Sequence, residues 1–243
     1  MANQTQKIEE HTLKILKIVD ESPSVKVFRV SLPTDAGIEF YAGQFFMVSF
    51  VEDSKIKDSR AYSIASSPMN KEYLEIALNR VGPFTIKLFQ MAEGNLLKFK
   101  GPYGKFYFNE DLKNSLVLIG AGTGITPLMS LIRYCNDKKL INKVKFLYSV
   151  KTPSDIIYKN DLNKIKITNK NFDYAVTITR AEESHNWHGR KGRIDLEFLR
   201  ENIDDIEGSV YYLCGSKEFV NSIIEMLESL GANKANIKTD IWG

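Results

Sequence analysis

The chain has 243 residues, of which 43% are hydrophobic and 26% charged, and this is the composition of a globular protein with room for two modest domains. Its 33 basic and 30 acidic residues leave a net charge of only +3, and no basic block interleaved with aromatic residues occurs, which argues against a nucleic-acid-binding protein. The only two cysteines, Cys135 and Cys214, lie far apart, so a structural zinc site and a four-thiolate iron–sulfur cluster are excluded and we expect no metal.

The N-terminal segment MANQTQKIEE is polar and lacks the apolar centre of a signal peptide. No apolar run approaches the ~18 residues that a membrane-spanning helix needs. Two cysteines without a pairing pattern fit a reducing compartment better than a disulfide-bonded secreted protein. We therefore expect a cytoplasmic protein without a membrane span.

The first part of the chain is predicted to consist of short antiparallel strands. The segments 11–20, 25–32, 44–51 and 72–80 are rich in β-branched and aromatic residues, and turn-forming residues separate them. One helix is expected over residues 83–92. Regular strand spacing of this kind favours a small antiparallel barrel.

Beyond about residue 112 the pattern changes, because strands begin to alternate with helices. The predicted strands are 115–120, 144–150, 174–179 and 210–215, and the predicted helices are 127–137 and 217–230. This alternation indicates a doubly wound parallel sheet. We expect two domains, residues 1–110 and 111–243, with a boundary near Phe108–Asn114.

A glycine-rich turn, GAGTGITP at residues 120–127, joins the first parallel strand to its helix. Glycine lets backbone amides approach a phosphate, and a helix N-terminus favours negative charge, so Gly122, Thr123 and Gly124 are candidates for binding a pyrophosphate. Pro127 can occupy the first helical turn, although it stands where the usual dinucleotide motif has a third glycine. A tight turn without a ligand is the alternative.

The residues at the ends of the next two strands indicate which nicotinamide cofactor, NADH or NADPH, is preferred. In common NAD-binding folds an acidic residue about 20 positions on holds the ribose 2′-hydroxyl, but the second strand here ends at Lys151 without a carboxylate. The third ends in Thr179 and Arg180, and Arg193 follows. Hydroxyl groups with cations suit a 2′-phosphate, so the pattern favours NADPH over NADH. Solvated surface charges are the alternative.

Several motifs occur in a characteristic order: RAYSIASSP at 60–68, GPYGKF at 101–106, GAGTGITP at 120–127, YYLCGS at 211–216 and the ending TDIWG. Together they resemble the ferredoxin–NADP reductase-like family of FAD- and NAD(P)H-dependent oxidoreductases over nearly the whole chain. The resemblance implies an antiparallel six-stranded FAD-binding barrel followed by a doubly wound NAD(P)-binding domain. It implies FAD as one cofactor and NADPH or NADH as the other.

The resemblance also assigns roles to residues of the first domain. Arg60 would pair with the FAD pyrophosphate, Tyr62 would pack on the isoalloxazine or ribityl group, and Ser63 would bond the flavin N5 edge. The second flavin-phosphate turn would comprise Arg80, Gly82, Pro83, Phe84 and Thr85, with backbone N–H groups of residues 82–84 and the Thr85 hydroxyl facing the phosphates. GPYGKF would be the turn that closes the barrel.

The last two motifs would complete the catalytic site. Cys214 and Gly215 end a strand where open α/β sheets place ligands, and Cys214 would lie beside the nicotinamide. Asp240 and Trp242 match the acid and the terminal aromatic residue of the family, and Trp242 would cover the flavin until the nicotinamide arrives. The resemblance thus makes Ser63, Cys214, Asp240 and Trp242 the catalytic residues.

These assignments predict hydride transfer from NAD(P)H to the flavin and then electron transfer to an acceptor outside the chain. Ferredoxin, flavodoxin, an oxygenase component or a small molecule would serve as acceptor, and we expect a monomer. An electron-transfer subunit of a larger redox complex and a free-flavin reductase are the alternatives. A nucleotide sensor that has lost redox chemistry is a third, against which the retained Arg60, Tyr62 and Ser63 argue.

Overall fold

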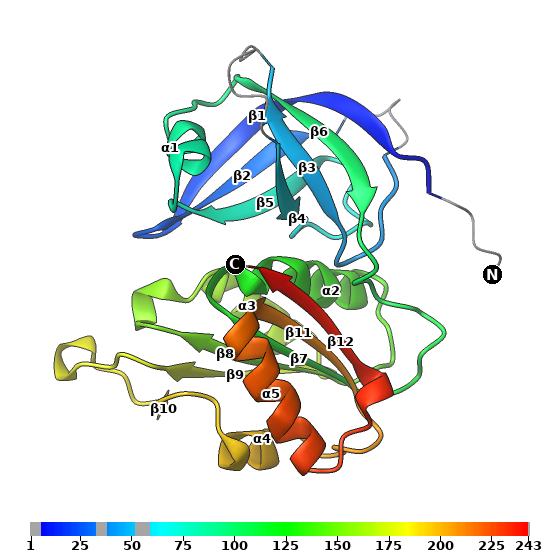
Figure 1. Cartoon of the computed structure of the whole chain (residues 1–243), viewed down its shortest axis with the longest axis vertical. Helices are drawn as coiled ribbons and strands as arrows, with labels where there is room; N and C mark the ends of the chain where they lie inside the picture. Colours follow the sequence, from blue (N-terminus) through cyan, green and yellow to red (C-terminus); the bar gives the residue numbers. More distant parts are fainter. Residues whose placement is uncertain (1–5, 33–37, 52–58, 243) are drawn as a thin grey trace.

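The computed structural model describes residues 6–32, 38–51 and 59–242, and in it two halves are stacked one above the other (Figure 1). The polar residues 1–5 and the final Gly243 of the predicted terminal motif lie outside the described residues. The first half contains one sheet and the second half another, each with six strands. The exact domain boundary between them stays a prediction.

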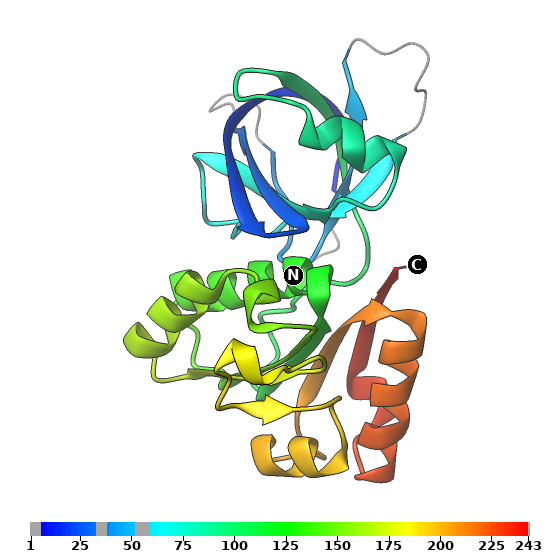
Figure 2. The ribbon, with the colours of Figure 1, turned by 90° about the vertical axis from the view of Figure 1, so that its left-hand side faces the viewer.

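The first half is an antiparallel sheet with the strand order β4-β3-β6-β1-β2-β5. Its strands are β1 Glu9–Ser22, β2 Val25–Ser31, β3 Phe45–Phe50, β4 Arg60–Ser63, β5 Tyr73–Asn79 and β6 Leu96–Tyr103. β4 and β5, at the two ends of this order, also contact each other, so the sheet curls into the near-closed ring seen in Figure 2. The predicted six-stranded antiparallel barrel is therefore confirmed.

The barrel interior is filled by the alternate side chains that each strand turns inward. Phe28, Phe46 and Phe99 are fully buried there, together with Leu88 of the helix α1, Pro83–Phe89. Burial of such large apolar side chains is the main force that holds the ring closed. α1 thus covers the barrel core while its first residues remain at the edge.

The second half is a parallel sheet with the order β10-β9-β8-β7-β11-β12. Its strands are β7 Leu116–Ala121, β8 Val144–Val150, β9 Phe172–Ile178, β10 Arg190–Lys191, β11 Val210–Ser216 and β12 Ile237–Trp242. The helices are α2 Ile125–Asp137, α3 Lys159–Thr168, α4 Leu196–Asn202 and α5 Lys217–Ser229. Apolar clusters lie on both faces of this sheet, as a doubly wound fold requires, and the predicted architecture is confirmed.

Two of the motif segments differ from the sequence-based expectation. GPYGKF is not simply a turn, because β6 continues through Tyr103; a Cβ atom on Gly101 would lie 2.8 Å from the Phe46 ring, so close packing requires glycine there. The terminal motif forms the strand β12, parallel to β11. A single strand at a sheet edge has no distinctive periodicity over six residues, so the sequence pattern does not predict it.

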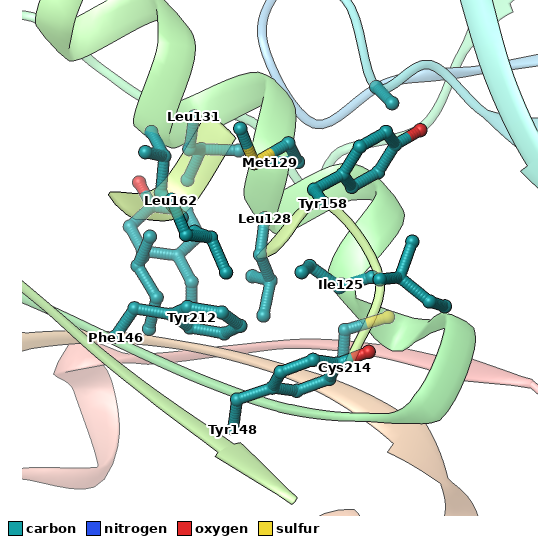
Figure 3. Packing of buried hydrophobic residues seen from close by; sticks show 14 of the residues in the cluster. Ile125, Leu128, Met129, Leu131, Phe146, Tyr148, Tyr158, Leu162, Tyr212 and Cys214 are labelled. Atoms are coloured by element: carbon teal, nitrogen blue, oxygen red, sulfur yellow. The ribbon is translucent and has the colours of Figure 1, made fainter. Parts of the chain in front are cut away.

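Helix α2 lies between the two halves, as Figure 1 shows. Its lower face packs on the parallel sheet, where Leu128 meets the aromatic rings of Phe146, Tyr148 and Tyr212 (Figure 3). Its opposite face meets the barrel, since the Ser130 hydroxyl donates to the carbonyl oxygen of Ser66 at 2.8 Å. In the described part of the chain, no helix is long and apolar enough to cross a membrane.

Candidate active site

A cavity of about 850 Å³ lies where the barrel meets the parallel sheet. The barrel contributes β4, the end of β5 and the start of α1, while the parallel half contributes the glycine turn, β11 and β12. Its lining includes most of the predicted flavin-side and catalytic residues, namely Arg60, Tyr62, Ser63, Gly82, Pro83, Phe84, Thr85, Thr123, Pro127, Cys214, Asp240 and Trp242. Residues that lie far apart in the sequence therefore line the same cavity.

Strand pairing explains how Cys214 and Asp240 come together. β11 and β12 run parallel with Cys214 opposite Asp240 and Ser216 opposite Trp242. The Cys214 thiol lies 3.8 Å from Asp240 Oδ2, and the Ser63 hydroxyl of the barrel lies 3.5 Å from the same oxygen. The carboxylate is thus a shared acceptor for one donor from each half.

Burial shifts the pKa values of this cluster upward. Burial, followed by the Asp240 charge, raises the pKa of the Cys214 thiol well above its ordinary value. Burial also raises the pKa of Asp240, although the bonds from Cys214 and Ser63 act in the opposite direction. Because the thiolate is the nucleophilic form of cysteine, Cys214 serves here as a neutral neighbour and weak hydrogen-bond donor.

The glycine turn is pressed against the same cluster. A Cβ atom on Gly124 would lie 2.4 Å from the carbonyl oxygen of Cys214, so only glycine lets α2 start this close to β11. Gly122 has φ +52°, in the left-handed region that favours glycine, and its carbonyl accepts a bond from the Tyr148 hydroxyl at 2.7 Å. The turn thus packs closely against β11, and its contact with a pyrophosphate stays a prediction.

On the barrel side, three side chains form a layered contact. The Arg60 guanidinium lies 5.7 Å from the centre of the Phe84 ring, and the rings of Tyr62 and Phe84 are 6.2 Å apart. Burial raises the pKa of Tyr62 to about 12, with Arg60 acting to lower it. Tyr62 therefore presents a neutral hydroxyl and an aromatic surface to the cavity.

The second predicted phosphate turn is only partly arranged as expected. The Thr85 hydroxyl accepts bonds from the N–H groups of Val81 and Gly82 at 2.9 and 3.1 Å and donates to the Gly82 carbonyl at 3.0 Å. The Gly82 N–H is already bonded to Thr85, and Pro83 has no N–H, so neither residue offers a backbone donor to a phosphate. The Thr85 hydroxyl is likewise engaged by its own turn. Arg80 is exposed and does not line the cavity.

Comparison with known proteins decides the family. Residues 12–108 match the oxidoreductase FAD-binding domain family, and residues 118–225 match the oxidoreductase NAD-binding domain family. NADH-cytochrome b5 reductase 2 of Candida glabrata is 30% identical over 219 residues, which cover 87% of this chain and 72% of that protein. This chain belongs to the ferredoxin–NADP reductase-like family.

The chain spans only about half the length of some of the proteins that it resembles. A subunit of the Na(+)-translocating NADH-quinone reductase of Marinomonas sp. is 28% identical over 214 residues, and the chain spans only 51% of that protein. The FAD/NAD-binding domain of nitric oxide dioxygenase from Vibrio cholerae superposes with a TM-score of 0.84 at 23% identity, over 96% of this chain and 98% of that chain. At 23% identity, the similarity to the nitric oxide dioxygenase domain shows the fold alone.

The cavity has the features that FAD, the cofactor of this reductase family, requires. A Cβ atom on Gly82 would meet no protein atom within 4 Å, so the backbone of the turn is open to a ligand. Tyr62 offers an aromatic surface for a flat ring, and Arg60 offers a cation for a phosphate. Ser63, Cys214 and Asp240 would then line the edge at which the two cofactors meet.

The predicted nucleotide residues divide between two smaller cavities of this reductase fold, at the carboxyl ends of the parallel strands. One, of about 270 Å³, is lined by Gly122, Thr123, Lys151, Thr179 and Trp242 among others. The other, of about 280 Å³, contains Thr179 and Arg193. Arg180 is exposed and lines neither, and Gly215 is buried against Phe219 of α5, where it permits close packing rather than contact with a ligand.

Asp155 lines the 270 Å³ cavity and was not among the residues predicted from the sequence. The second parallel strand ends without a carboxylate, but the short turn Pro153–Asp155 returns Asp155 to the 270 Å³ cavity. Asp155 Oδ2 accepts bonds from the Thr152 N–H at 3.0 Å and the Thr152 hydroxyl at 2.8 Å. The spacing Thr152-x-x-Asp155 is a capping pattern and was the signal available in the sequence.

Proposed function

We propose that this chain is a reductase that oxidises NADH at a bound FAD and delivers electrons to a separate acceptor. The observation that carries the proposal is the meeting of Ser63 from the barrel with Cys214 and Asp240 from the parallel half in one cavity. Such a meeting place for two cofactor-binding halves suits direct hydride transfer, which requires reacting atoms within about 3–3.5 Å.

In this proposal the residues of the chain orient the two cofactors and shield them from water, and the flavin supplies the redox chemistry when bound. Ser63 and Cys214 are held by the shared Asp240 carboxylate, so their donors point to one place. Trp242, at the end of β12, lines both the large cavity and the 270 Å³ nucleotide cavity. This position supports a role for Trp242 in covering the flavin and moving aside for the nicotinamide.

Asp155 supports NADH as the preferred donor, against the preference for NADPH that the strand ends favour. A carboxylate in the nucleotide cavity accepts hydrogen bonds from ribose hydroxyls and repels a 2′-phosphate. The relatives from Candida glabrata and Marinomonas sp. are both named for NADH. Lys151 and Arg193 are the residues that would favour NADPH instead.

The acceptor is proposed to be a separate carrier such as a ferredoxin, a flavodoxin or an oxygenase component. The same two relatives are named for cytochrome b5 and for quinone. Bound flavin links a two-electron donor to one-electron acceptors, which is the property that such a reductase needs.

Anaerobic titration tests this proposal directly. The purified protein is expected to be yellow, with an absorption band at about 450 nm from oxidised flavin, and to bleach on addition of one equivalent of NADH. We expect NADPH to bleach it more slowly at equal concentration. A yellow protein that neither nucleotide reduces would contradict the proposed function.

Asp155→Asn tests the donor preference. Asparagine keeps an acceptor for Thr152 but removes the charge, so we expect the ratio of kcat/KM for NADPH to that for NADH to rise about tenfold, or 1.4 kcal/mol. Asp137→Asn, at the exposed end of α2, makes the same change in net charge outside the cavity and is expected to leave the ratio unchanged. Equal effects of the two substitutions would show that Asp155 does not discriminate.

A further inference from the structure

A buried carboxylate that does not line the large cavity joins the two halves. Glu75 of β5 is fully buried, with 0% of its side chain exposed. One oxygen accepts a bond from Arg29 Nε of the barrel at 2.7 Å, and the other accepts a bond from an Nη of Arg133 of α2 at 2.6 Å. One carboxylate thus has a partner within its own half and a partner in the other half.

Arg133 is held on all sides. The Nη that contacts Glu75 also donates to the carbonyl oxygen of Ala65 at 2.9 Å, and the other Nη donates to Asp161 of α3. The guanidinium lies over the Tyr158 ring, 4.8 Å from its centre, and only 12% of the side chain is exposed. A planar guanidinium group with this many hydrogen-bond partners is held in one orientation.

The elements that this ion pair joins also carry the walls of the active site. Pro127 lines the large cavity and precedes Arg133 on α2 by a helical distance of roughly 9 Å. Asn79 lines the same cavity and follows Glu75 on β5 by about 13 Å. Ala65, which Arg133 also contacts, comes just after β4, the strand of the flavin-side residues.

We propose that Arg133 is a positioning residue: through Glu75 and Ala65 it fixes the angle at which the nicotinamide half faces the flavin half. The proposal rests on the proposed function for the reaction that it serves. Its geometric basis is that the pair bridges the halves, whereas the Arg29–Glu75 pair lies within the barrel. Glu75, Arg133 and Ala65 do not line the large cavity.

The two arginines of Glu75 provide matched variants. Arg133→Met removes the bond between the halves, while Arg29→Met removes a bond to the same carboxylate inside one half. We expect Arg133→Met to slow anaerobic flavin bleaching at saturating NADH about tenfold, with less than a threefold change in the Kd for NAD⁺. Arg29→Met is expected to leave both values within twofold of the parent protein. Arg133→Lys, which keeps the charge but not the planar guanidinium group, should fall between.

Hydrogen–deuterium exchange on the flavin-loaded protein gives a second readout that does not depend on turnover. Residues 64–67, which lie against α2, are expected to exchange at least tenfold faster in Arg133→Met and at the parent rate in Arg29→Met. Equal slowing of bleaching and equal exchange in the two variants would overturn the positioning role. Failure of the parent protein to bleach would instead refute the proposed function, so the two results are distinguishable; if Arg133→Met does not fold, Arg133→Lys carries the comparison.

Discussion

Replacing Gly124 by alanine is expected to slow reduction of the bound flavin by about a hundredfold and to lower the melting temperature by roughly 6–12 °C. The added methyl group would lie 2.4 Å from the carbonyl oxygen of Cys214, where ordinary contact begins at 3.4 Å. That carbonyl belongs to β11, which is paired with a strand on each side and holds the peptide in place. The start of α2 must therefore move by about 1 Å, and a misplacement of that size is enough to cost two orders of magnitude in rate.

Stopped-flow bleaching with NADH and thermal melting measure the two effects of Gly124→Ala. Gly82→Ala is the control for melting, because a Cβ atom there meets nothing within 4 Å and the backbone is extended, with φ −174°. We expect its melting temperature to stay within about 2 °C of the parent. A Gly124→Ala protein that melts and bleaches like the parent would show that the turn does not depend on close approach to β11.

Removing the charge of Glu75 is expected to lower the stability of the protein strongly. Glu75→Gln keeps the shape of the side chain but leaves Arg29 and Arg133 without the carboxylate that each contacts. Loss of one partner of a buried pair costs about 3 kcal/mol or more, which corresponds to a fall in melting temperature of roughly 6–12 °C for a chain of this size. Differential scanning calorimetry measures the shift.

Glu72→Gln serves as its control, because Glu72 precedes β5 and is exposed. Its melting temperature should stay within about 2 °C of the parent. If Glu75→Gln melts with the control, the two arginines find other partners and the carboxylate is not needed for the fold.

Much of the fold follows from patterns that local sequence can carry. Short runs of β-branched and aromatic residues between turn formers predict barrel strands, and the run SLVLIG predicts a buried parallel strand that the structure places at the centre of its sheet. The glycine turn itself is predicted, but for its approach to a phosphate; the structure adds a second reason at Gly124, which is close packing against the Cys214 carbonyl. The order of five motifs indicates the family, which the comparisons confirm.

The rest depends on contacts between residues distant in the sequence. The Arg133–Glu75 pair spans 58 positions and the boundary between the halves, and no spacing rule connects such residues. Asp155 reaches its cavity only because a three-residue turn reverses the chain after β8. The motif assigns Thr85 to phosphate by its position, whereas its hydroxyl bonds its own turn. The individual roles of the site residues stay predictions.

The environment of Cys214 affects how readily its thiol is oxidised. Sulfur is oxidised to sulfenic acid mainly as the thiolate, and burial with a neighbouring carboxylate keeps the proton on this sulfur. Peroxide reaching the cavity therefore meets the slow-reacting form of cysteine. Asp240, which contacts the thiol, therefore also slows its oxidation.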